Sequence, residues 1–289
     1  MRFALGSGYK SGAGQRRSRR ADNVRSVIPD DRSTLKSRYD EIALSLDDRT
    51  TACDYNLRDL EIDLGTEYIR DGDTVLDVGC GLGVALRAYA SRRRIQAVGI
   101  DYSGNMIEGA RRRLAEEAPN LAISFQEASV AELPLPDSGF DVVTSHRCLM
   151  ALLEWELQQA ALVEIHRVLR PGGTLVLLEG TFDGLERLNF FRRQFGLEEI
   201  EAGGRDRLLT LKFHERELLD YIDPLFEVLR VQRFGMYYFL TRIVQPLLVA
   251  PDPPRYDHRL NEVAKDIARV VPDLEHMGHL VGFVLRKRG

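Results

Sequence analysis

Short apolar stretches alternate with amphipathic ones between residues 60 and 180. The apolar stretches have the length of β-strands and are bounded by polar turn residues. They are residues 74–78, 95–101, 122–128, 140–146 and 174–180. The intervening stretches have helical spacing: residues 103–117 place Met106 and Ala110 on one face, and residues 155–169 place Leu162 and Ile165 on one face. This alternation predicts parallel βαβ units in a doubly wound α/β sheet.

The pattern changes after residue 180. Residues 181–211 are rich in aromatic and basic side chains and do not fit another strand–helix unit, so we expect a helical cap there. Residues 226–235 and 279–287 are expected to be two final strands, and residues 260–270 a helix between them. The sheet would then have seven strands.

A glycine-rich turn follows the first predicted strand. Residues 75–85 read VLDVGCGLGVA, with Gly79, Gly81 and Gly83 at alternate positions. Such a turn lets a ligand touch the backbone, and the N-terminus of the following helix favours polar or anionic ligand groups. A dinucleotide fingerprint needs a third glycine at position 84, where this chain has Val84, so a dehydrogenase is disfavoured.

Asp101 ends the second predicted strand. In doubly wound sheets, ligands lie beyond the carboxyl ends of the strands, so this carboxylate is expected to bind the two hydroxyls of a ribose. The position alone does not choose between nicotinamide and other nucleoside cofactors. Capping of the next helix is the alternative role.

Four ordered blocks carry a resemblance to class I S-adenosylmethionine-dependent methyltransferases. They are residues 75–85, 98–103, 132–143 (ELPLPDSGFDVV) and 168–175 (VLRPGGTL). The resemblance implies a doubly wound, mostly parallel, seven-stranded Rossmann-like methyltransferase sheet with a helical cap insertion. It also implies S-adenosylmethionine as cofactor, with methionine on the glycine loop, ribose on Asp101 and adenine beside Tyr102 and Met106.

The same resemblance gives the full set of expected cofactor contacts. They are Asp77, Gly79, Cys80, Gly81, Gly83, Asp101, Tyr102, Met106, Ser129, Val130, Ser145 and His146. One departure stands out: many members have Gly-Asp-Ala where this chain has Ala128-Ser129-Val130. A serine oxygen can still accept from the adenine amino group, but a neutral contact contributes about 0.5–1.5 kcal/mol rather than the roughly 1.5–3 kcal/mol of a charged one.

His146 ends the fourth predicted strand and is the candidate catalytic residue. Its ordinary pKa suits removal of a proton from an acceptor, while contact with the cofactor alone is the competing role. Tyr39, Tyr55 and Arg58 resemble a lid over cofactor and substrate, although ordinary helix packing explains the tyrosines equally well. The three cysteines match no zinc or disulfide spacing, so no metal is expected and a reducing cytoplasm fits best.

Length, charge and composition indicate the domain organisation and the kind of partner to expect. The chain of 289 residues has a net charge of −4, and no stretch suggests a membrane span. We expect a disordered basic tail (1–30), a helical lid (31–70), the cofactor-binding core (71–180), the cap (181–215) and the rest of the sheet with a substrate-side insertion (216–289). A small-molecule acceptor is favoured. One alternative is a methyltransferase that acts on RNA or protein and binds it through the basic tail. Another is a non-catalytic module that binds the cofactor or a partner. The sequence does not indicate the oligomeric state.

The first prediction concerns residues 1–30, where seven basic residues face two acidic ones and give a charge of +5. Because no apolar face in this segment could join a core, its deletion should leave folding and cofactor binding unchanged. Thermal unfolding and calorimetric titration with S-adenosylhomocysteine check this. A large fall in melting temperature would show that the tail is structural.

Overall fold

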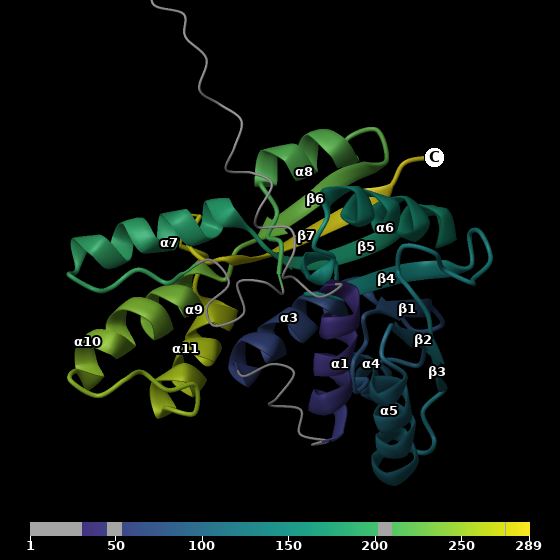
Figure 1. The fold of residues 1–289 in the computed structure, drawn as a ribbon, viewed down its shortest axis with the longest axis horizontal. Helices are drawn as coiled ribbons and strands as arrows, with labels where there is room; N and C mark the ends of the chain where they lie inside the picture. The colour runs from purple at the N-terminus through teal and green to yellow at the C-terminus, as the bar shows by residue number, and fades with distance from the viewer. Residues whose placement is uncertain (1–30, 45–53, 202–209, 275) are drawn as a thin grey trace, which may run out of the picture.

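All seven predicted strands form one sheet. The computed structural model describes residues 31–44, 54–201, 210–274 and 276–289, and its strand order is β3-β2-β1-β4-β5-β7-β6 (Figure 1). The strands are β1 (Thr74–Val78), β2 (Gln96–Asp101), β3 (Ile123–Glu127), β4 (Phe140–His146), β5 (Leu169–Gly180), β6 (Phe226–Gln232) and β7 (Leu280–Lys287). Among the strands of the described residues, β7 alone runs antiparallel to both of its neighbours, β5 and β6. The predicted doubly wound, mostly parallel fold is confirmed.

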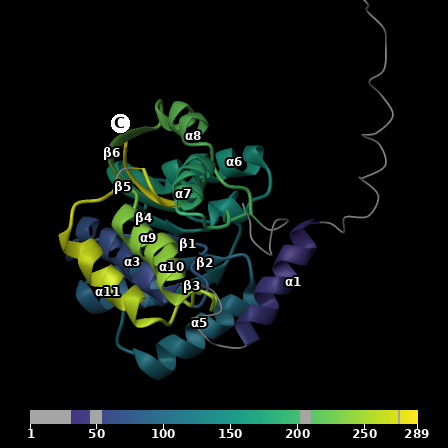
Figure 2. The same ribbon diagram turned by 90° about the vertical axis from the view of Figure 1, so that its left-hand side faces the viewer.

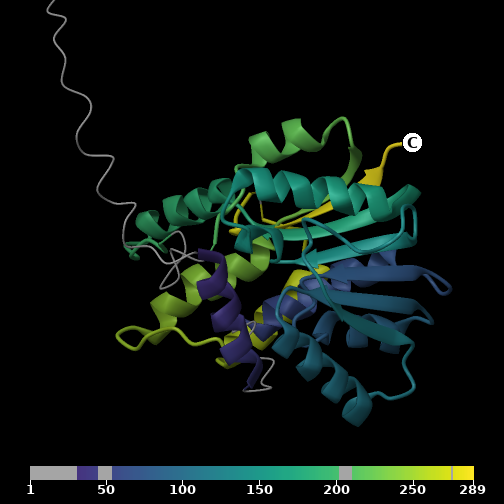
Figure 3. The same cartoon turned by 45° about the vertical axis from the view of Figure 1, so that its right-hand side comes forward.

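Helices cover both faces of the sheet (Figures 1 and 3). Alternate residues of the central strands enter different apolar clusters: Leu76 of β1 packs with α6 (Trp155–Val168) and α8 (Glu215–Ile222), whereas Val75 packs with helices on the other face. Those helices are α3 (Tyr55–Tyr68), α4 (Val84–Arg92) and α5 (Gly104–Glu117). Strands buried on both faces read as continuous apolar runs, which is why β1 and β5 are recognisable in the sequence.

An N-terminal helix, α1 (Asp31–Leu44), lies against α5 (Figure 2). Ala43 packs with Leu82 and Met106, and the Ser103 hydroxyl donates a 2.5 Å hydrogen bond to Asp40. These contacts hold α1 beside the turn after β1 and the start of α5. Part of the segment expected to form a lid therefore borders the carboxyl edge of the sheet.

The second half of the chain contains more helix than the sequence predicts. The first helix after β5 is α7 (Phe182–Gln194), which lies in the segment expected to form a helical cap. The predicted strand 226–235 is wrong at its end, because Phe234 has a φ of 55° and α9 begins at Gly235. The next elements are α9 (Gly235–Phe239), the π-helix η3 (Leu240–Val244), α10 (Gln245–Val249) and α11 (Arg259–Val270).

A buried polar cluster joins α3 to α9 and η3. Asp54 caps α3 by accepting from the N–H of Leu57, and its carboxylate also accepts from Tyr237 Oη at 2.5 Å and from the Arg242 guanidinium. Around this cluster, apolar residues of α3, α7, α9 and α11 pack against β5 and β7. No helix in the described residues is long and apolar enough to cross a membrane.

Replacement of Asp54 tests this cluster. Asp54→Ala leaves Arg242 with no buried counter-charge and should lower the free energy of unfolding by about 3–5 kcal/mol. The matched control is Asp59→Ala on the same helix, where the ion pair with Lys265 is partly exposed and its loss should cost less than about 1 kcal/mol. Denaturant unfolding measures both, and equal effects would contradict the structural role of Asp54.

Candidate functional site

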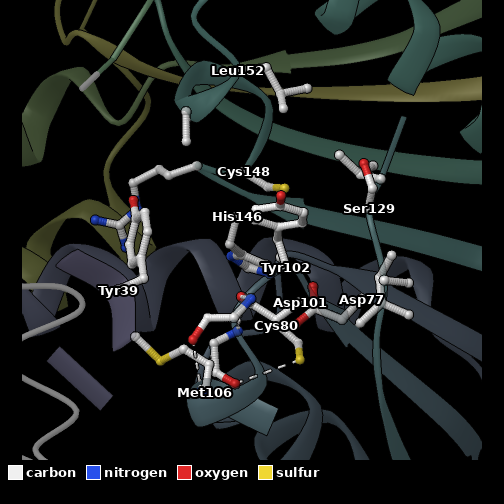
Figure 4. A pocket seen from close by; sticks show the side chains of 18 of the residues that line it. Tyr39, Asp77, Cys80, Asp101, Tyr102, Met106, Ser129, His146, Cys148 and Leu152 are labelled. Carbon is white, nitrogen blue, oxygen red and sulfur yellow. Dashed lines mark hydrogen bonds between the residues drawn. The ribbon is translucent and has the colours of Figure 1, made fainter. Parts of the chain in front are cut away.

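A cavity of ≈ 580 Å³ opens at the carboxyl ends of β1, β2 and β4 (Figure 4). Its size lies within the range of about 300–1,000 Å³ typical of small-molecule sites. The lining comes from the turns after these strands, from residues 128–132 after β3, and from α-helices. The α-helical residues are Lys36 and Tyr39 of α1, Arg58 of α3, Val84 and Ala85 of α4, Met106 of α5, and Leu157 and Ala160 of α6. The chain reverses its winding between β1 and β4, and this is where doubly wound sheets bind ligands.

The three glycines of the turn after β1 have left-handed backbone conformations but different surroundings. A Cβ on Gly79 would lie 2.5 Å from Cys148 Sγ, and one on Gly83 would lie 2.6 Å from the Phe125 ring. A Cβ on Gly81, whose φ is 51°, would meet nothing within 4 Å. Gly79 and Gly83 are therefore required by packing. Gly81 leaves its backbone open to a ligand.

Asp101 faces the same turn from the end of β2. Its carboxylate accepts from the N–H of Gly81 at 2.9 Å and from the N–H of Ser103 at 2.9 Å. A carboxylate has about four acceptor positions, so two remain for hydroxyl donors in the cavity. Burial raises the pKa of Asp101 to about 6, against the lowering effect of those two N–H groups. The alternative of an N-cap is not realised, since the Ser103 hydroxyl caps α5.

The expected adenine region borders this carboxylate. Met106 is buried and lines the cavity, and Tyr102 is 53% exposed, with its ring centroid 5.0 Å from Lys36 Nζ. The Lys36 ammonium also pairs with Glu127 at 2.8 Å, which links α1 to β3. Ser129 and Val130 line the cavity, and Ser129 Oγ already accepts from the N–H of Ala131 at 3.3 Å. One acceptor position of the serine is thus used before any ligand binds.

Asp77 of β1 and Cys80 of the following turn both line the cavity. Asp77 is buried at the end of β1 and accepts from the Thr144 hydroxyl at 2.7 Å; burial raises the pKa of its carboxyl. Burial also raises the pKa values of Cys80 and Cys148 well above the ordinary thiol value. Both cysteines therefore remain protonated and act as packing groups.

His146 lines the cavity, but its two ring nitrogens face other protein groups. Nε2 lies 2.9 Å from Tyr89 Oη, and Nδ1 is buried, 3.6 Å from Glu61 Oε2. A general base needs an accessible nitrogen within hydrogen-bond reach of the acceptor's proton. This geometry favours the contact role for His146 over the catalytic one.

Glu61 connects His146 to Arg147. The Glu61 side chain is fully buried, and Arg147 Nη2 donates to its Oε2 at 3.0 Å. Burial is the largest single influence and raises the pKa of Glu61, but Arg147, His146 and Arg58 together outweigh it, so the net pKa lies below the ordinary value and the carboxyl is ionised. Arg147 itself has a φ of 58°, a left-handed conformation that non-glycine residues rarely adopt.

Ser145 is expected from the sequence to contact the cofactor, and the structure corrects this. Its side chain is fully buried and its hydroxyl donates to Glu179 Oε1 at 2.9 Å. Glu179 also accepts from the N–H groups of Leu149 and Met150 at 2.9 and 3.0 Å, so it anchors the turn after β4, although burial raises its pKa to about 7. A lone acid in the apolar segment 174–180 was the signal that sequence reasoning missed.

The lid candidates divide in two. Tyr39 and Arg58 line the cavity, and burial together with the Asp101 charge raises the pKa of Tyr39 to about 12. The third lid candidate, Tyr55, does not line the cavity, and neither does Gly83, which was expected to contact the cofactor. The cap at 181–215 and the insertion at 216–289 also contribute no described residue to the lining, because α7, α9 and α11 pack against the sheet and α3 instead. Residues 202–209 and the tail 1–30 lie outside the described part.

Comparisons with known proteins agree on the domain. The profile of the family described as "Methyltransferase domain" matches residues 75–173. The chain is similar to a demethylmenaquinone methyltransferase of Symbiobacterium thermophilum, 35% identical over 43% of this chain and 50% of the relative. It is also similar to a 2-phytyl-1,4-naphtoquinone methyltransferase of a Nostoc species, 34% identical over 54% of this chain and 65% of the relative. The chain thus matches between half and two thirds of the length of these two relatives.

Solved structures share the fold. A chain from a complex with the Trm112 methyltransferase activator of Haloferax volcanii has a TM-score of 0.59 and 20% identity, covering 91% of this chain and all of that one. The [4+2]-cyclase SpnF has a TM-score of 0.53 and 25% identity, covering 80% of each chain. Together, the four sequence blocks and the family match identify residues 75–173 as a methyltransferase domain. The cyclase shows that fold alone does not fix the reaction.

A pH titration tests the role of Asp101. Its folded pKa of about 6 means that the carboxyl gains a proton, and loses acceptor capacity, as pH falls through 6. Affinity for S-adenosylhomocysteine should therefore be constant above pH 7 and fall by up to about tenfold per pH unit below 6. Asp101→Asn should bind more weakly and lack this step; the same pH profile in both proteins would contradict the assignment.

Proposed function

We propose that the protein transfers the methyl group of S-adenosylmethionine to a small-molecule acceptor. The observation that carries the proposal is the pairing of open backbone at Gly81 with the carboxylate of Asp101, which accepts the N–H of that glycine and retains acceptor positions. A nucleoside with two free hydroxyls and a flexible amino-acid arm fits this pair. The family match over residues 75–173 supports the same cofactor.

The chain's own residues then have separate tasks. S-adenosylmethionine supplies a methyl group already activated on a positively charged sulfur. Asp101 holds the ribose, the Gly81 backbone admits the amino-acid arm, and Met106 and Val130 pack the base. Tyr39 of α1 closes the cavity and excludes water. With an electrophile already present, aligning the acceptor behind the methyl group provides most of the rate enhancement.

His146 has a positioning role in this proposal. Its contacts with Tyr89 and Glu61 fix the ring at the end of β4, where it forms part of the cavity surface. Replacement by alanine is expected to weaken cofactor affinity more than turnover at saturation. A pH–rate profile that follows an imidazole pKa would instead restore the catalytic role.

Small-molecule acceptors are favoured over macromolecules. The two curated relatives named above are named for quinone-type acceptors, and the described lining of the cavity lies within the body of the protein. Cys80 and Cys148 are free thiols, which accords with activity in a reducing cytoplasm. If the protein instead bound an RNA or protein substrate through residues 1–30, it would methylate total RNA or protein and would not methylate metabolite extracts.

The test compares two glycines that both have a left-handed backbone conformation. Gly81 and Gly172 both have positive φ, at 51° and 74°, and a Cβ on either would meet nothing within 4 Å, but only Gly81 lines the cavity. Gly81→Val should reduce affinity for S-adenosylhomocysteine by at least about 100-fold, whereas Gly172→Val should leave it unchanged. The two variants should lose similar stability, about 1–3 kcal/mol.

Calorimetry and thermal unfolding give both quantities. Equal affinities in the two variants would contradict the proposed cofactor site. Binding of S-adenosylhomocysteine without methylation of any component of a metabolite, RNA or protein extract would favour a binding module or a reaction of the cyclase type.

A further inference from the structure

One wall of the cavity lies beyond the residues assigned to the cofactor. It follows β4 and is defined here as the distal wall: Arg147, Ala151, Leu152, Leu153, Leu157 and Ala160. In Figure 4, Leu152 lies across the cavity from Met106, with His146 and Cys148 between them. Five of its six side chains are apolar, so this part of the cavity suits an apolar ligand.

Arg147 is the charged member of the distal wall. Its side chain is 27% exposed, and one N–H of the guanidinium is used by Glu61 at 3.0 Å. A guanidinium has five N–H donors. Among the described residues, the bond to Glu61 is the only side-chain hydrogen bond of Arg147, so donors remain for a ligand.

The backbone holds this arginine in place. Arg147 has a φ of 58°, and its N–H donates to the Leu178 carbonyl at 2.7 Å. Such conformations persist only where surrounding structure enforces them, and they concentrate at ligand sites. Here the turn that Glu179 anchors enforces the conformation and directs the chain along the cavity.

The charge that the distal wall presents to the cavity is positive. Arg147 lines the cavity, whereas its counter-charge Glu61 is fully buried and does not line it. The nearest lining acid along the chain, Glu154, is exposed to solvent. The adjacent His146 has no open nitrogen with which to take a proton. An acceptor that arrives as an anion would match the guanidinium and would need no base.

We propose that the distal wall is the acceptor subsite, an inference that rests on the proposed function. The acceptor is an apolar molecule with an ionised hydroxyl group, of phenolate or enolate type. Its negatively charged oxygen binds the guanidinium of Arg147. The hydroxyl proton passes to water before reaction. The oxygen then forms a bond to the methyl carbon as the carbon–sulfur bond breaks, and the electron pair of that bond stays on sulfur. An anion and a cation become two neutral groups.

A pair of probes of similar shape tests the charge requirement. One is 2-hydroxy-1,4-naphthoquinone, which is ionised at neutral pH, and the other is the neutral 2-methyl-1,4-naphthoquinone. Wild-type protein saturated with S-adenosylhomocysteine should bind the anion at least about tenfold more tightly, the effect of one hydrogen bond to a charged group. Equal affinities would overturn the proposal.

Variants locate the effect. Arg147→Gln should remove the preference for the anion, while Arg230→Gln, a surface change of the same charge at the ion pair with Glu67, should keep it. If Arg147→Gln does not fold because Glu61 loses its partner, the double variant Glu61→Gln/Arg147→Gln takes its place. A preference for the anion that survives loss of Arg147 would overturn the assignment.

A second ligand pair separates acceptor from cofactor. If Arg147 instead binds the carboxylate of the cofactor, Arg147→Gln should lower the affinity for S-adenosylhomocysteine but not the affinity for 5′-methylthioadenosine, which lacks the amino-acid arm. That result would overturn the acceptor assignment. Unchanged affinity for both ligands supports it. Failure of wild-type protein to bind S-adenosylhomocysteine at all would refute the proposed function itself, independently of the two naphthoquinones.

Discussion

Parallel pairing of β1 with both β2 and β4 is the constraint on which the site depends. Val78 of β1 pairs with Ile100 of β2 and with Ser145 of β4, so three strands end at one level. The turns that leave these strands must diverge, because the chain winds in opposite directions on either side of β1. The glycine loop, Asp101 and the turn after β4 therefore meet at one opening.

The charges at this opening are matched to ligands of opposite sign. Asp77 and Asp101 are acids that burial disfavours in their ionised form, as their raised pKa values indicate. A sulfonium and an ammonium group nearby would offset that cost, since an opposite charge favours the ionised form. On the distal wall the guanidinium of Arg147 suits an anion. Under the proposed function, the cationic cofactor would lie beside the two acids and an anionic acceptor beside Arg147, so that they meet at the position of methyl transfer.

Sequence reasoning succeeded where periodicity or spacing carried the information. The continuous apolar runs predict β1 and β5, and the interval from Gly79 to Asp101 identifies the ribose-binding candidate. Sequence reasoning failed where two side chains that form a hydrogen bond come from distant segments of the chain. Tyr89 and His146 are 57 positions apart, and neither position alone indicates that they bond. The helices between 235 and 249 were missed because most positions in that stretch are apolar and its three polar residues do not mark one face with a helical period.

The proposed function requires a nucleoside to bind between Gly81 and Asp101. A crystal structure with S-adenosylhomocysteine tests it most directly. We expect both ribose hydroxyls within about 2.5–3.0 Å of the Asp101 carboxylate, with the sulfur facing the distal wall and the amino-acid arm against the Gly81 backbone. A ligand bound elsewhere, or a ribose that makes no contact with Asp101, would contradict the account.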